Sequence, residues 1–279
     1  MLSLLLKHFF NFMKIFLPFL TAVVLTVLIS SCASNPYAAS NRMYKRQSKE
    51  LAHTIRQIPL QPQQEEWAGT TNFGLRKPNY LIIHHTAQSS TDQTLKTFTV
   101  TRTQVSAHYV IGRDGKVYHM LNDYLRAWHA GASKWGNATD INSSSIGIEL
   151  DNNGYEPFAE PQISSLLMVL ADLKKTNGIP AANFIGHSDI APGRKVDPNA
   201  NFPWKRLAEN GYGLWPDEVL DSVPGTFNPQ EALRIIGYDV KNVDLAISSF
   251  KLHFIQNDIS PILNEYDKQV LYNLYKKYL

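Results

Sequence analysis

The chain has 279 residues, of which 44% are hydrophobic and 18% are charged, as in ordinary globular proteins. This composition excludes a largely disordered chain and a protein with many membrane spans. The formal net charge of +3 is small and scattered, which argues against nucleic acid as a partner. Because Cys32 is the single cysteine, an intrachain disulfide and a cysteine-rich zinc knuckle are excluded, and any metal site must use His, Asp or Glu.

The N-terminal segment has the pattern of an export signal. Lys7 and Lys14 are followed by an apolar run with no further charge before Arg42. The run ends in small residues directly before Cys32, which resembles the lipobox of bacterial lipoproteins. This resemblance implies a signal peptide over residues 1–31, lipidation of Cys32, and an outer-membrane lipoprotein facing the periplasm of a Gram-negative bacterium. An uncleaved transmembrane anchor with an incidental cysteine is the alternative.

Several segments predict β-strands. The continuous apolar run over residues 80–83 is typical of a strand buried on both faces. Residues 108–111 and 116–118 flank an Asp-Gly turn and predict a β-hairpin. Further strands are predicted over residues 145–150 and 184–186.

One long helix is predicted between the last two strands. Apolar residues repeat at helical spacing from Ile163 to Leu173, with Pro161 at the start and Gly178 just past the end. Strands interleaved with helices indicate an α/β fold, in which a mixed central sheet is flanked by helices, and we expect this domain to cover residues 46–217.

The segments on either side of this domain differ in composition. Residues 32–45 are small and polar and predict a tether. Residues 218–227 predict a linker, and residues 228–279 contain three helical patterns. Because three short helices form only a marginal core, this module is expected either to pack on a neighbour or to serve binding.

Candidate metal ligands follow two of the predicted strands. His84 and His85 close the first strand, and at most one of them can face a given site because side chains alternate along a strand. The loop after residue 186 carries His187, Lys195 and Asp197. The last two point to one side if the segment is extended. A surface salt bridge between them is the alternative interpretation.

A carboxylate lies within the apolar strand over residues 145–150. Alternation places Glu149 on the face opposite Ile148 and Leu150. Burying a carboxylate without a partner is costly, so Glu149 is expected to be functional or paired.

Together these residues resemble a known family. His84, the strand with Glu149, and the pattern His187-x7-Lys195-x-Asp197 are similar to the type 2 N-acetylmuramoyl-L-alanine amidases, relatives of the peptidoglycan recognition proteins. The segments Trp128-His129-Ala130-Gly131 and Ser106-Ala107-His108-Tyr109 also look like this family. The resemblance covers residues 76–217, and the C-terminal helices resemble a degenerate peptidoglycan-binding module.

The resemblance implies a zinc hydrolase. His84, His187 and Asp197 would hold Zn²⁺, Glu149 would act as general base, and Lys195 would stabilise the oxyanion. The bond cut would join N-acetylmuramic acid to L-alanine of the peptidoglycan stem peptide. Peptidoglycan or muropeptides would be the substrate, the membrane would be reached through the lipid anchor, and a monomer is favoured.

Other positions are open to more than one interpretation. Some phage members of the family place a catalytic tyrosine where this chain has Ala107, which leaves the base role to Glu149. We expect His129, Trp128 and His108 to contact substrate, with Trp135 as a flat apolar wall. The alternative for both tryptophans is packing in the core. We expect His85 to pack or hydrogen-bond behind the site.

Two other functions compete with the amidase. A non-catalytic peptidoglycan recognition protein would need a broken ligand set, whereas His84, His187 and Asp197 are all present. A zinc peptidase cutting within the stem peptide would use similar metal chemistry, but the chain carries no His-Glu-x-x-His helix.

Overall fold

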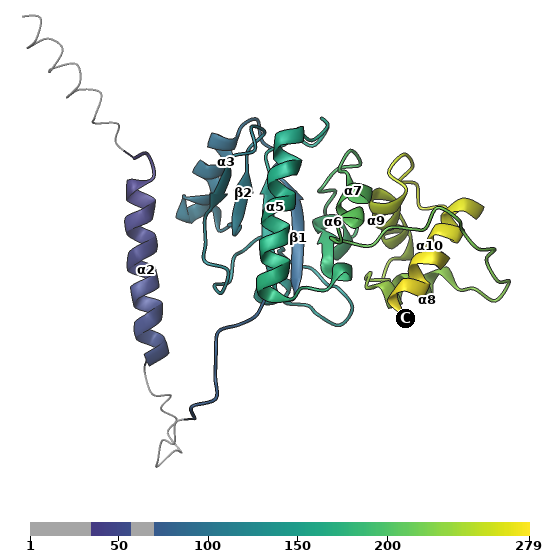
Figure 1. Ribbon diagram of the computed structural model, residues 1–279, viewed down its shortest axis with the longest axis horizontal. Helices are drawn as coiled ribbons and strands as arrows, with labels where there is room; N and C mark the ends of the chain where they lie inside the picture. The colour runs from purple at the N-terminus through teal and green to yellow at the C-terminus, as the bar shows by residue number, and fades with distance from the viewer. Residues whose placement is uncertain (1–34, 57–69) are drawn as a thin grey trace, which may run out of the picture. The chain divides into compact units, whose positions relative to one another are not determined.

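The computed structural model describes residues 35–56 and 70–279 (Figure 1). The chain divides into two units, residues 1–69 and residues 70–279. The predicted signal peptide, Cys32 and the first residues of the predicted tether lie outside the described residues. In the described parts of the chain, no helix is both long enough and apolar enough to cross a membrane.

The first unit contains one described helix, α2 (Ala38–Arg56). This helix crosses the boundary that we expected at residue 46, and part of the predicted tether is helical. The segment contains neither Gly nor Pro, so nothing in it interrupts a helix. The small polar residues that suggested a tether do not prevent this.

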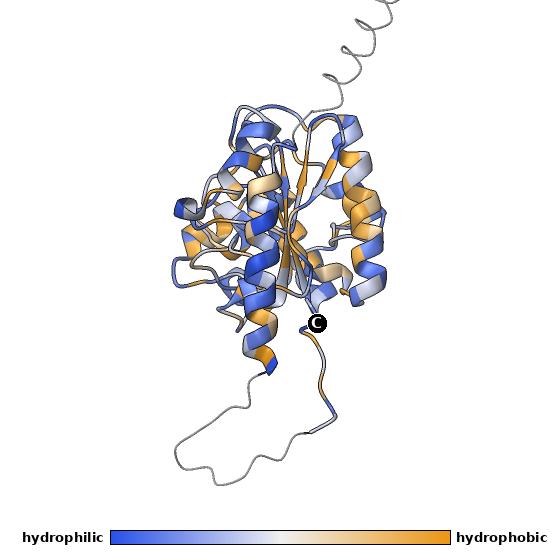
Figure 2. Cartoon of the chain, turned by 90° about the vertical axis from the view of Figure 1, so that its left-hand side faces the viewer, coloured by the Kyte–Doolittle hydropathy of each residue, from blue (hydrophilic) through white to orange (hydrophobic). Residues whose placement is uncertain are grey.

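The second unit contains a five-stranded mixed sheet in the order β3-β2-β4-β1-β5. Its strands, which are predominantly hydrophobic in Figure 2, are β1 (Tyr80–His85), β2 (Tyr109–Ile111), β3 (Val117–His119), β4 (Ser145–Leu150) and β5 (Phe184–Gly186). Strand β1 is parallel to both β4 and β5, and β2 is parallel to β4. Strands β2 and β3 form the predicted antiparallel hairpin. The expected fold class is therefore confirmed.

Helices and short turns connect and cover the strands. The helices of this unit are α3 (Thr91–Phe98), α4 (Ile141–Ser144), α5 (Glu160–Asn177), α6 (His187–Ile190), α7 (Trp204–Glu209), α8 (Pro229–Ile236), α9 (Val243–Phe254) and α10 (Glu265–Tyr278). Two 3₁₀ turns occupy Thr101–Thr103 and Ala181–Asn183. Gly178 ends α5 in the left-handed conformation, with φ of 64°, as the sequence pattern predicted.

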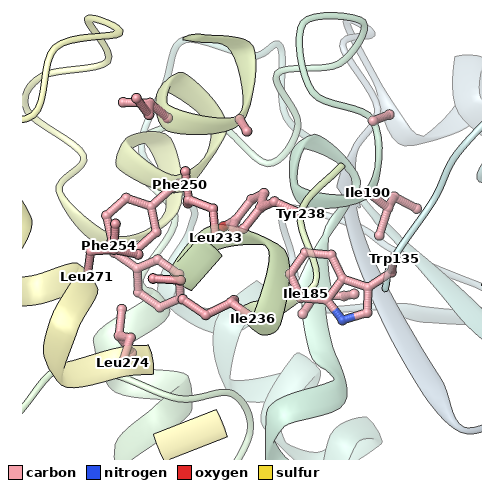
Figure 3. Close-up of a cluster of buried hydrophobic side chains, with 14 of the residues drawn as sticks. Trp135, Ile185, Ile190, Leu233, Ile236, Tyr238, Phe250, Phe254, Leu271 and Leu274 are labelled. Carbon is pink, nitrogen blue, oxygen red and sulfur yellow. The ribbon is translucent and has the colours of Figure 1, made fainter. Parts of the chain in front are cut away.

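Each face of the sheet has its own core, because side chains alternate along β1. Leu81 and Ile83 pack against the apolar side of α5. Ile82 points to the other face and belongs to a cluster that continues into the C-terminal helices (Figure 3). This cluster joins residues of the amidase-like part to residues of the three helices: Trp135, Ile185, Ile190, Leu233, Ile236, Tyr238, Phe250, Phe254, Leu271 and Leu274.

The C-terminal helices therefore pack on the sheet, and one core runs across the segment that we expected to be a linker. Trp135 is only 5% exposed, and its ring meets the ring of Tyr238 edge-on at 5.0 Å. The expectation that Trp135 forms a wall of the substrate groove is wrong, because the C-terminal helices cover it.

A buried carboxylate lies at this junction. Asp189, in α6, is fully buried, and its Oδ2 accepts hydrogen bonds from the Gly186 backbone N–H and from His253 Nδ1, both at 2.7 Å. Its Oδ1 accepts a hydrogen bond from the Tyr238 hydroxyl, also at 2.7 Å. The three donors satisfy a desolvated charge, and two of them come from the C-terminal part of the chain.

Replacing Tyr238 with Phe should reveal the strength of this junction. The substitution keeps the ring and removes one donor from a buried carboxylate, so we expect the free energy of unfolding to fall by about 1–3 kcal/mol. Urea denaturation of Tyr238→Phe beside Tyr266→Phe, whose ring is exposed, would test this. Equal stability of the two variants would contradict the prediction.

Candidate metal centre

Three side chains converge at the carboxyl ends of the parallel strands, where α/β sheets place their sites. His84 is the residue before the last in β1, His187 follows β5 directly, and Asp197 lies at the end of the loop after α6. The Ser188 N–H donates to the Asp197 carbonyl oxygen at 2.8 Å, which returns the loop to its starting point. All three side chains are buried, and one ligand atom of each lies within 4.8 Å of the others.

The contacts inside this group are short. His84 Nδ1 lies 2.9 Å from His187 Nδ1 and 3.0 Å from Asp197 Oδ2, and His187 Nδ1 lies 3.1 Å from the same oxygen. Whether these atoms carry protons follows from what the opposite ring nitrogens bind.

For His187 the assignment is direct. Its Nε2 lies 3.1 Å from the Ala130 carbonyl oxygen, which can only accept, so Nε2 carries the ring proton. In the neutral imidazole, Nδ1 then presents a lone pair to the centre.

For His84 the assignment follows a chain of hydrogen bonds. The Ser145 hydroxyl donates its one proton to the Ile141 carbonyl oxygen at 2.6 Å, so its oxygen accepts from His129 Nε2 at 3.1 Å. His129 Nδ1 therefore accepts from His84 Nε2, also at 3.1 Å. His84 Nδ1 is left without a proton and, like His187 Nδ1, presents a lone pair to the centre.

The protonation states agree with this arrangement. Burial lowers the pKa of His84 to about 4, with the neighbouring His187 adding to the effect. The lowered pKa of His84 agrees with an Nδ1 atom that carries no proton.

Two imidazole lone pairs and a carboxylate oxygen that face one another repel unless a cation lies between them. Nitrogen and oxygen donors from two His and one Asp, with both second ring nitrogens engaged, are a donor set that Zn²⁺ accepts. Tetrahedral zinc with bonds of about 2.0–2.1 Å separates its ligand atoms by about 3.3 Å, close to the distances found here. The residues present fit a zinc ion.

Glu149 lies beside this group. The β1–β4 register pairs it with His84, and alternation along β4 turns it to the same face of the sheet. The carboxylate atom Oε2 is buried and has no hydrogen-bond partner among the described residues. Burial and, to a smaller extent, the charge of Asp197 raise the pKa of Glu149 to about 8, against the opposing charge of Lys195. A carboxyl group in this state can exchange protons near neutral pH.

The structure brings Lys195 into the same neighbourhood. Its backbone N–H donates to the Ala191 carbonyl oxygen at 3.1 Å, within the loop that leads to Asp197. The side chain is half-buried, and its charge lowers the pKa of both His84 and Glu149. Lys195 is thus a cation close to the proposed reaction centre.

The residues expected to contact substrate occupy different environments. Trp128 is 51% exposed, so it is accessible at the surface. Its backbone N–H donates to Ser106 Oγ at 2.9 Å. His129 is half-buried, and both its ring nitrogens bind protein atoms. Instead of lining a groove, His129 supports His84.

The expectation for His108 is wrong, because its side chain is fully buried. Its Nδ1 accepts from the Gly147 N–H at 3.1 Å, and its Nε2 lies 3.0 Å from the Leu125 carbonyl oxygen. Burial lowers its pKa to about 4. His108 therefore connects the start of the hairpin to β4 and does not reach substrate.

Sequence reasoning missed part of the support around the centre. Asn142 Oδ1 accepts the backbone N–H groups of His129 at 3.0 Å and Ala130 at 2.9 Å, which fixes the segment that binds both imidazoles. Arg194 Nη2 donates to the Ala130 carbonyl oxygen at 2.8 Å. A polar residue in a local sequence pattern gives no signal for such distant partners.

His85 lies behind the site, where its Nδ1 accepts a hydrogen bond from the Asn199 N–H at 3.1 Å.

Comparisons with known proteins agree with this site. The family model of N-acetylmuramoyl-L-alanine amidases (Amidase_2) matches residues 74–200, a span that includes the whole buried group and Glu149. The N-acetylmuramoyl-L-alanine amidase AmiD of Escherichia coli is 36% identical over 206 residues, which are 62% of this chain and 74% of that protein.

Two solved structures are also similar. The complex of E. coli AmiD with anhydro-N-acetylmuramic acid-L-Ala-D-gamma-Glu-L-Lys has a TM-score of 0.66 and 29% identity, and the match covers 75% of this chain and 93% of that chain. AmpDh3 from Pseudomonas aeruginosa has a TM-score of 0.67 and 27% identity, over 79% and 99% of the two chains. Because the chain matches the family model and is similar to E. coli AmiD over most of that protein's length, it belongs to the N-acetylmuramoyl-L-alanine amidase family.

Proposed function

We propose that this amidase uses a zinc ion held by His84, His187 and Asp197 to hydrolyse the amide bond between N-acetylmuramic acid and L-alanine of the peptidoglycan stem peptide. The observation that carries the proposal is the convergence of three unprotonated ligand atoms beside Glu149, whose buried oxygen has no partner among the described residues. The similar E. coli AmiD structure contains an anhydro-muropeptide, which supports a peptidoglycan fragment as the substrate here.

Each residue has a separate task in the reaction. Zn²⁺, when bound, supplies Lewis-acid chemistry and lowers the pKa of water to about 7. Glu149 takes a proton from the attacking water at its carboxylate and gives it to the nitrogen of L-alanine as the C–N bond breaks. Lys195 stabilises the negative charge that develops on the carbonyl oxygen. His129 and the Ala130 carbonyl hold the two imidazoles with their Nδ1 lone pairs directed inward.

The location of the enzyme belongs to the same proposal. A signal over residues 1–31 and lipidation of Cys32 would place the protein in the cell envelope, attached to the outer membrane and facing the periplasm. Residues 33–279 contain the complete candidate metal centre, so the reaction can be tested on the chain without its anchor.

We expect residues 33–279 to release a free stem peptide beginning with L-alanine from a purified muropeptide. A chelator should abolish release and added Zn²⁺ should restore it, since both imidazole lone pairs need a cation. Mass spectrometry of the products gives the result. Cleavage within the peptide would instead indicate a zinc peptidase, and tight binding without cleavage would indicate a recognition protein.

The substitution Glu149→Gln should separate metal binding from turnover. We expect kcat to fall by about 10²–10⁴-fold, the usual contribution of a general base, with one zinc still bound per chain. The exposed Glu218→Gln is the matched control and should change neither quantity. Retained turnover in Glu149→Gln would contradict the assignment of Glu149 as general base. Stoichiometric zinc in His84→Ala would contradict the assignment of His84 as a ligand.

The raised pKa of Glu149 also predicts how the stability of the metal-free protein depends on pH. Between the ordinary value of 4.5 and about 8, the folded state keeps a proton that the unfolded state has lost, so the free energy of unfolding falls as pH rises through this window. The Glu149→Gln variant has no carboxyl group at this position, so its free energy of unfolding lacks this decrease with pH. From the lower to the upper end of the window, its stability relative to the original chain should therefore increase by at least about 1.4 kcal/mol, the equivalent of one pKa unit.

Urea denaturation in the presence of a chelator, at the two ends of this window, measures the effect. The other titrating groups are common to both proteins and cancel in the comparison. A stability difference that is independent of pH would show that Glu149 titrates as an ordinary exposed carboxyl group.

A further inference from the structure

The positive charge of the chain after Cys32 is concentrated on helix α2. This helix carries five Lys or Arg residues and one Glu, whereas residues 57–279 carry 20 basic and 23 acidic residues. The five basic side chains are exposed: Arg42, Lys45, Arg46, Lys49 and Arg56. The charge is therefore available to an external anionic surface.

The same helix presents an apolar stripe. Tyr44, Leu51 and Ile55 are separated by seven and four residues, a spacing that places them on one side of an α-helix. Their exposed fractions are 37%, 48% and 77%. Arg46 and Lys49 project from the opposite side, and no residue of α2 is buried.

A helix with a narrow apolar stripe, a strongly basic polar side and low overall hydrophobicity is typical of peptides that lie in the plane of a membrane surface. We propose that α2 is an interfacial helix that binds the anionic surface of a phospholipid bilayer, with Leu51 and Ile55 in the boundary between headgroups and acyl chains and the basic residues directed to lipid phosphates. The occupant of this surface is thus a membrane, and not another protein.

The position of α2 in the chain supports a membrane as the occupant. The helix begins six residues after Cys32, the proposed lipidation site, so a lipidated chain would hold it beside the bilayer. Lipid phosphates complement its charge, and each Lys or Arg near an anionic bilayer contributes binding energy. A carbohydrate wall would match the charge through its peptide carboxylates but offers no apolar layer for Leu51 and Ile55.

The test uses residues 33–279, which lack Cys32 and therefore any acyl chain, so that binding measures the helix and not the proposed anchor. We expect this protein to cosediment with vesicles of phosphatidylethanolamine and phosphatidylglycerol, and not with vesicles of phosphatidylcholine alone. Hydrogen exchange should slow over residues 38–56 when the anionic vesicles are present. Amidase activity on a soluble muropeptide is measured separately and should be unchanged by the variants below.

Two pairs of substitutions address the two sides of the helix. Arg46→Gln/Lys49→Gln keeps helix-forming side chains and should weaken binding to anionic vesicles by about tenfold or more. The matched control, Lys175→Gln/Lys241→Gln, removes the same charge from exposed positions of the second unit and should bind as the original chain does. Leu51→Gln/Ile55→Gln should also weaken binding, because it removes the apolar stripe.

Four results would overturn the proposal. Equal loss of binding in the control pair would show that only net charge matters. If Leu51→Gln/Ile55→Gln left binding unchanged, the apolar stripe would not enter the bilayer, and α2 would not be an interfacial helix. Hydrogen exchange that slows in the second unit and not in α2 would assign membrane binding to the second unit. If Arg46→Gln/Lys49→Gln lost binding to isolated sacculi but kept binding to vesicles, the basic side of α2 would be assigned to the cell wall.

Discussion

The parallel pairing of β1 with β4 and β5 is the constraint on which the site depends. It sets His84 opposite Glu149 and ends β5 at the level of Ile83, so that His187 begins the next turn beside His84. Because side chains alternate, a shift of one residue in either pairing would turn His84 or Glu149 into the core under α5. The apolar residues that fill the two faces of the sheet therefore also fix the positions of the polar residues at its edge.

The turn that carries His187 is held from the opposite side by the C-terminal helices. Asp189 lies two residues further along α6 and receives its donors from Gly186, Tyr238 and His253. A buried carboxylate that lost these partners would be strongly destabilising, so the turn, the proposed ligand and the C-terminal helices are coupled in one folding unit. The three C-terminal helices, which alone would form only a marginal core, share the core on this face of the sheet, and the loop around the centre gains a rigid support.

Much of this arrangement could be predicted from local patterns. The apolar run before His84, the Asp-Gly hairpin and the helical spacing up to Leu173 each depend on residues close together in sequence, and the structure confirms them. His108 and Trp135 could not be assigned in this way. Their burial depends on packing against segments far along the chain, and the same sequence pattern fits a groove or a core.

The residues that support the candidate metal centre show the same limit. A histidine in a sequence can be a ligand, a contact for substrate or a partner of another histidine, and the resemblance alone suggested the second role for His129. Only the chain from His84 through His129 and Ser145 to the Ile141 carbonyl oxygen shows which nitrogen carries each proton. The sequence also gives no indication of the partners of Asn142, because these are two backbone N–H groups.

The centre is also where the fold departs from what stability alone would favour. A buried carboxylate oxygen without a partner and three ligand atoms with facing lone pairs both cost free energy in the metal-free protein. The surrounding hydrogen bonds prevent the side chains from rotating to relieve these costs. The same rigidity that keeps Glu149 desolvated and His84 unprotonated prepares the site to bind a cation and to accept a proton, so the local cost in stability and the proposed chemistry have one physical origin.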